Sequence, residues 1–207
     1  MVLIDTGLDE TDRIQIQETM KTWGLEKRQI SDVFLTHAHF DHAGNAFWFE
    51  KAGAHVWAGE ADADSIEKGD DHTIFFAYGK PFPTCQRVRR LKDSEKILLS
   101  DSCKLNCFHT PGHTKGSICY EFVGKGKRIL FTGDFLQAGE EDGSVRMGIR
   151  VDPGYSFKEY LSSVKKMMNV ESKAVLPGHF RPYLKPAFGL MQAAYRELLV
   201  NREKYKN

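Results

Sequence analysis

Residues 37–42 read His-Ala-His-Phe-Asp-His, and this hexapeptide decides how the rest of the chain is interpreted. Neutral imidazoles and a carboxylate are the ligands that divalent ions such as zinc prefer. The eight residues before it are rich in β-branched and aromatic side chains and predict a buried strand. On a tight turn after that strand, His37 and His39 can face one ion while Asp41 and His42 face a second. A polar loop with local hydrogen bonds is the weaker interpretation, because four ligand-type side chains cluster here.

The composition of the chain is that of an ordinary globular protein. It has 207 residues, a formal net charge of +1 and 41% hydrophobic residues. The small net charge argues against nucleic acid or an anionic membrane as a partner, and no apolar run reaches the roughly 20 residues of a membrane span. The four cysteines form no C-x-x-C pair, so we expect reduced thiols and a cytoplasmic location. The expected partner is a small-molecule substrate.

The pattern of apolar residues predicts alternating strands and helices. Strands are predicted at 2–7, 29–36, 54–58, 96–100, 103–109, 118–123, 128–132 and 173–179. Helices are predicted at 9–23, 43–51, 157–169 and 187–204. The third of these helices opens with Ser156-Phe-Lys-Glu159, the pattern of a capping box.

Residues 60–95 interrupt this alternation. They begin with acidic residues and continue with an aromatic and proline-containing stretch at 75–82, and three arginines follow at 87–90. A long, weakly periodic segment in a compact domain is usually a lid or binding insert. A packed excursion whose aromatic residues fill a small core of their own is an equally good interpretation.

Three more residues that can bind metal lie just past predicted strands in the second half of the chain. They are His113, Asp134 and His179, and glycine stands directly before each one. Glycine allows the backbone to turn sharply and to approach other groups closely. The repeated order of strand, glycine and ligand therefore predicts that these side chains converge on the same place as the hexapeptide.

These motifs together resemble the metallo-β-lactamase-fold hydrolases. The similarity covers Val2-Leu-Ile-Asp-Thr-Gly7, Thr36-His-Ala-His-Phe-Asp-His-Ala-Gly-Asn45, Thr110-Pro-Gly-His-Thr114, Thr132-Gly-Asp134 and Pro177-Gly-His179. It implies an α/β protein, an αββα sandwich of two mixed sheets flanked by helices, with metals in a groove at one edge. The single domain would span 1–207 and consist of two halves of similar build, 1–95 and 96–207.

The resemblance also implies a role for each metal-site residue. Metal one would be held by His37, His39 and His113, and metal two by Asp41, His42 and His179. Asp134 would bridge the two ions. Zinc is the expected metal, with iron or manganese as alternatives. Asp5 resembles the family's acid outside the ligand set, which orients the site, although a simple turn residue would also fit.

The implied chemistry is hydrolysis by a hydroxide shared between two divalent ions, with Asp41 as the catalytic proton acceptor. The arrangement is most similar to the glyoxalase-II-like hydrolases of thioesters and lactones. It departs from the related lactonases, which carry tyrosine where this chain has Gln137. The alternatives are a phosphodiesterase or nuclease of the same fold, and a sulfur dioxygenase with one iron on His37, His113 and Asp134.

The first predicted strand begins directly after Met1. Members of the family usually have further strands before it, and a sheet without them would expose an unpaired edge and part of an apolar face. We therefore expect a homodimer in which a second copy pairs with this edge or packs over the exposed face. A shortened chain, with the aromatic residues 75–82 folded over the gap, is the alternative.

Overall fold

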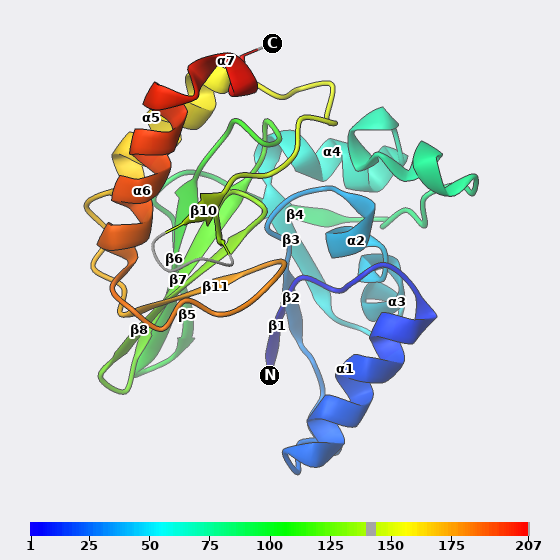
Figure 1. Cartoon of the computed structure of the whole chain (residues 1–207). Coiled ribbons are helices and arrows are strands. Elements are labelled where there is room, and N and C mark those ends of the chain that lie inside the picture. Colours follow the sequence, from blue (N-terminus) through cyan, green and yellow to red (C-terminus); the bar gives the residue numbers. More distant parts are fainter. Residues whose placement is uncertain (140–143, 207) are drawn as a thin grey trace.

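The computed structural model describes residues 1–139 and 144–206, and two sheets lie face to face between outer layers of helices (Figure 1). The helices of the first half cover one sheet, and those of the C-terminal part cover the other. This arrangement confirms the predicted αββα sandwich, but of the two sheets predicted to be mixed only the second is mixed among the described strands. Among the described helices, none combines the length and the apolar character that crossing a membrane requires.

The first sheet has the order β1-β2-β3-β4, and every described pair in it is parallel. Its strands are β1 (Val2–Ile4), β2 (Asp32–Phe34), β3 (His55–Gly59) and β4 (Val88–Leu91). Parallel pairing follows because helices connect successive strands and return the chain to the same end of the sheet. These helices are α1 (Glu10–Thr22), α2 (Phe40–Ala43), α3 (Ala46–Lys51) and α4 (Glu60–Lys68), followed by 3-10 turns at Asp71–Thr73 and Phe75–Tyr78.

The second sheet is mixed and has the order β11-β8-β7-β6-β5, with only the β11–β8 pair parallel among the described strands. Its strands are β5 (Lys96–Ser100), β6 (Cys103–His109), β7 (Ile118–Gly124), β8 (Lys127–Gly133) and β11 (Ala174–Pro177). A short ladder of β9 (Gln137–Ala138) and β10 (Val145–Arg146) follows β8. The helices are α5 (Phe157–Met167), α6 (Ala187–Val200) and α7 (Arg202–Tyr205). Ser156 accepts a hydrogen bond from the Glu159 amide at the start of α5, as the capping pattern predicts.

Three apolar cores correspond to the three interfaces between the layers. The central one joins the sheets and includes Phe34 and Leu91 of the first sheet with Leu105 and Tyr120 of the second. The other two lie between each sheet and its helices. Both sheets therefore have buried apolar residues on both faces, and the predicted metal-site residues lie beyond the strand ends.

Both ends of the segment 60–95 form regular secondary structure, although its sequence is only weakly periodic. Residues 60–68 form α4, and 88–91 form an edge strand of the first sheet. Helix α4 is hard to predict because its buried side includes Asp62, which breaks the apolar pattern. Phe75 and Phe82 are buried in the core between the first sheet and its helices. The aromatic stretch thus contributes to packing, and its action as a lid stays a prediction.

Strand β1 lies at one edge of the first sheet and pairs only with β2 among the described strands. A groove of about 600 Å³ runs beside this edge, lined by apolar residues that include Leu3, Ile4 and Leu176. The homodimer expected from the sequence would use this edge, and it stays a prediction. Light scattering at micromolar concentration tests it, and a clean monomer would contradict it.

Candidate metal centre

The hexapeptide follows β2 and turns into the short helix α2. Thr36, His37 and Ala38 lie between the two elements, and His39 is the N-cap residue of α2 without a capping hydrogen bond from its side chain. Asp41 and His42 lie in the single turn of α2. The change from extended to helical backbone within six residues points the side chains in several directions. As a result, the segment contributes to three overlapping groups of ligand-type atoms: His37 and His39 with His113, Asp41 and His42 with His179, and His37 and His42 with Asp134.

The glycines before Asp134 and His179 are required by close approach of the backbone. Gly133 has a φ of +50°, and a Cβ there would lie 2.3 Å from Thr36 Oγ1. A Cβ at Gly178 would lie 2.4 Å from Cε1 of His42. A larger residue at Gly133 or Gly178 would therefore force Thr36 or His42, or the turn itself, to shift.

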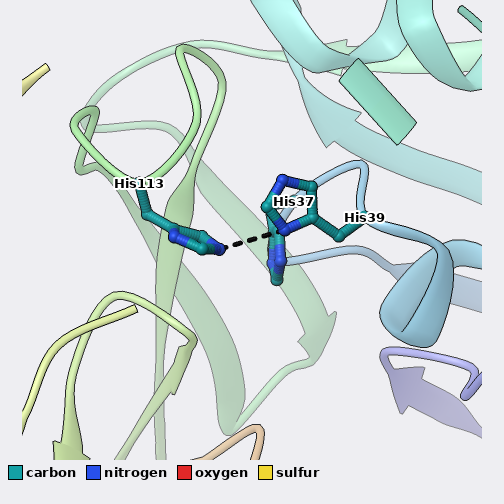
Figure 2. A group of neighbouring side chains, drawn as sticks. All are labelled: His37, His39 and His113. Atoms are coloured by element: carbon teal, nitrogen blue, oxygen red, sulfur yellow. Dashed lines mark hydrogen bonds between the residues drawn. The ribbon is translucent and has the colours of Figure 1, made fainter. Parts of the chain in front are cut away.

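The first cluster consists of His37, His39 and His113, which are 1%, 2% and 0% exposed. Figure 2 shows the three rings converging, with Nε2 of His113 3.1 Å from Nδ1 of His39. Nε2 of His37 is buried and has no hydrogen-bond partner among the described residues. A buried nitrogen lone pair without a partner is costly, unless the site takes up a ligand that uses it.

The second cluster consists of Asp41, His42 and His179. Nε2 of His179 lies 3.0 Å from Oδ2 of Asp41 and 3.2 Å from Nε2 of His42. All three residues line the groove beside β1. This cluster is therefore reached from solvent, whereas the first is enclosed.

Asp134 lies between the clusters. Its Oδ1 is 3.4 Å from Nε2 of both His42 and His179, and its Oδ2 is 3.9 Å from Nε2 of His113. Gln137 also donates to Oδ1, at 3.0 Å. The structure thus brings together all seven residues predicted from the sequence; their roles as ligands stay predictions.

Three more aspartates surround the seven residues. Asp5 accepts hydrogen bonds from Nδ1 of His42 at 2.8 Å and from Thr36, which is more than a turn residue would do. Asp152 lies 3.4 Å from Nε2 of His39 and also contacts His72. Asp62 contacts the backbone between His37 and His39. The sequence indicates only Asp5, because the other two meet their partners through contacts distant along the chain.

The electrostatics of the histidines differ between the clusters. Burial lowers the pKa of His37 well below its usual value and that of His113 to about 3. Burial would also lower the pKa of His42, but the charge of Asp5 and the contact with Asp134 outweigh it and raise the pKa well above the usual value. A hydrogen bond with Asp41 raises the pKa of His179.

The spacing of the donor atoms fits a metal ion. Two nitrogens bound tetrahedrally at about 2.0–2.1 Å from zinc are about 3.3 Å apart. The closest nitrogen pairs are 3.1 Å apart in the first cluster and 3.2 Å apart in the second. Each set of ligand-type atoms also lies within 4.8 Å. The residues present are thus compatible with one divalent ion in each cluster.

Comparison with known proteins agrees with the family resemblance seen in the sequence motifs. The model of the metallo-beta-lactamase superfamily matches residues 1–179. The human acyl-coenzyme A thioesterase MBLAC2 is 29% identical over 211 residues, covering 88% of this chain and 70% of that protein. The probable polyketide biosynthesis zinc-dependent hydrolase PksB of Bacillus subtilis is 27% identical, covering 73% and 57%. A solved B3 metallo-beta-lactamase with an active-site glutamic acid has a TM-score of 0.75 at 23% identity, covering 100% and 82%.

Proposed function

This chain belongs to the metallo-beta-lactamase superfamily, and we propose that it is a metal-dependent hydrolase that cleaves thioesters of small molecules. The observation that carries the proposal is the position of Asp134 between two clusters of ligand-type atoms. Two adjacent sites joined by one carboxylate are the arrangement of a two-metal hydrolase.

In this proposal His37, His39 and His113 would hold one ion, and Asp41, His42 and His179 the other. Bound divalent ions, with zinc as the proposed choice, would lower the pKa of water towards about 7 and polarise the substrate carbonyl. Asp41 lies at the groove with its side chain 30% exposed, so it can accept a proton from water. Asp5 fixes the orientation of the His42 ring.

The choice of a thioester rests on two features. The human relative is named as an acyl-coenzyme A thioesterase, and the relative from Bacillus subtilis is named as zinc-dependent. Gln137, at the position of the lactonase tyrosine, is 5% exposed and directs its amide to Asp134, so it offers no hydroxyl to a lactone. A phosphodiester remains less suited, because the net charge is +1.

One preparation of the protein tests this proposal. Elemental analysis is expected to find close to two divalent ions per chain. An acyl thioester, a lactone, a β-lactam and a phosphodiester are then offered under the same conditions, with the Asp134→Ala protein as the control for contaminating activity. Turnover of the thioester above the others supports the proposal. One bound iron with oxidation of a persulfide, or preference for the phosphodiester, would contradict it.

A further inference from the structure

Asp62 is a buried carboxylate that joins the two loops carrying the first cluster. It lies in the first turn of α4 and is 3% exposed. Its Oδ2 accepts hydrogen bonds from the Ala38 amide at 3.0 Å and from Thr114 Oγ1 at 2.7 Å. Its Oδ1 accepts one from the Gly116 amide at 2.6 Å. One side chain therefore contacts both segments that supply histidines to this cluster.

The donors to Asp62 stand beside the ligand residues. Ala38 lies between His37 and His39, and Thr114 directly follows His113. Asp62 itself does not form a hydrogen bond with these imidazoles among the described contacts. It thus contacts the backbone or hydroxyl groups on both sides of the cluster without occupying a ring nitrogen of these histidines.

The backbone around Asp62 is packed too closely for this contact to be incidental. A Cβ added at Gly116 would lie 2.3 Å from the Asp62 amide nitrogen. A Cβ added at Gly59, before the first turn of α4, would lie 2.0 Å from the Gly116 carbonyl oxygen. Both glycines let the start of α4 press against the turn at 110–117, where the positive end of the helix favours a carboxylate.

Stability alone gives a poor reason for a charge at this position. Burial raises the pKa of Asp62, even though Thr114 and the two amides donate to it. A buried charge costs free energy that a well-packed apolar residue would not. An apolar residue at position 62, however, could not accept hydrogen bonds from both the turn of Ala38 and the turn of Thr114 and Gly116.

We propose that Asp62 is the positioning residue of the first cluster, and that it sets the distance between the turn of His37 and His39 and the turn of His113. This inference rests on the proposed function, because it concerns metal binding at that site. Asp62 has no direct contact with Asp41, His42 or His179 among the described hydrogen bonds and ion pairs, so its direct contacts are to the segments that carry the first cluster. Outer partners of metal ligands typically change metal affinity by about 10- to 100-fold.

The test measures metal affinity rather than turnover. Asp62→Asn is made in a His179→Ala background, where only the first cluster is complete, and in a His113→Ala background, where only the second is complete. Zinc affinity is measured by competition with a chelator, and the absorption spectrum of bound cobalt reports the ligand geometry. We expect a loss of about 10- to 100-fold and an altered spectrum in the first background, with no change in the second.

Thr114 provides a second pair of variants in case Asp62→Asn does not fold. Thr114→Val removes one hydrogen bond to Asp62 and is expected to weaken the first site, whereas Thr114→Ser keeps the hydroxyl and restores the affinity. Equal zinc affinities in all variants, or equal losses at both clusters, would overturn the role of Asp62. The proposed function would still be supported in that case if the unmodified protein binds two ions. Failure of the unmodified protein to bind any metal would overturn both.

Discussion

The two ligand clusters lie side by side but offer opposite surroundings. The histidines of the first are at most 2% exposed, and Asp62 and Asp152 contact the segments or rings that form it. In the second, the side chains of Asp41 and His179 are 30% and 42% exposed. In the proposed function, this difference would let the first cluster retain its ion while water and substrate reach the second.

The histidine pKa values follow the same division. They are lowered for His37 and His113 and raised for His42 and His179. Neutral imidazoles are ready to bind a metal ion, whereas protonated ones must first lose a proton. The first cluster should therefore bind its ion over a wider pH range than the second.

Replacement of the residue that the clusters share should have the largest effect. Asp134→Ala removes the carboxylate between them, so both sites should lose affinity and the rate should fall by on the order of a thousandfold. Elemental analysis and kcat/KM on the thioester check this. Full metal content with normal activity would show that Asp134 does not join the two sites.

A matched pair of ligand variants should separate the clusters. His113→Ala should empty the enclosed site, and His179→Ala should weaken only the open one, each by roughly a hundredfold or more in affinity. Because the enclosed site is held by more outer contacts, the His179→Ala protein should retain the more tightly bound ion. Chelator titration of both proteins measures this, and the reverse order would refute the comparison.

Acidification should distinguish the clusters without any substitution. A raised histidine pKa means that the proton is kept to a higher pH, and bound protons compete with the metal. As the pH falls, the second cluster should lose its ion first, since the pKa values of His42 and His179 are raised and that of His113 is about 3. Metal content after dialysis at successive pH values should therefore fall in two steps; simultaneous release of both ions would argue against the difference.

Glu121, a buried carboxylate whose described hydrogen-bond partners include no predicted metal ligand, provides a control for the Asp62 variant. Glu121 in β7 accepts hydrogen bonds from Arg128, Ser172 and Asn106. Glu121→Gln should lower the free energy of unfolding by about 1–3 kcal/mol at neutral pH and leave metal affinity unchanged. Altered metal binding in this variant would mean that the effects of Asp62 are not specific.

The contribution of Glu121 to the free energy of unfolding should decrease as the pH falls. Burial would raise the pKa of Glu121, but its hydrogen bonds with Arg128 and Ser172 outweigh this and lower it. Its contribution to stability is therefore present above the unfolded-state pKa of about 4.3 and is lost as the pH falls through the folded-state value. Urea unfolding at several pH values should show the difference between the two proteins shrinking in acid.

Local sequence patterns predicted the convergence of the ligands but not the structure that supports it. The hexapeptide and the glycines before Asp134 and His179 are local signals, and the strands at 96–100 and 103–109 have the predicted bounds. The role of Asp62 was not predicted, because an acidic residue in a sequence normally indicates a position at the surface, whereas Asp62 is buried. Asp152 contacts His39, 113 positions earlier, and no short pattern records such a contact.

The distribution of the seven residues along the chain has a consequence for folding. Four come from the turn after β2, and His113, Asp134 and His179 come from turns after strands of the second sheet. Neither half alone carries a complete set for the first cluster or the second. A bound ion would therefore favour only the state in which both sheets are assembled, and its binding free energy would add to the stability of that state. Two separately produced halves should consequently associate more tightly when metal is present.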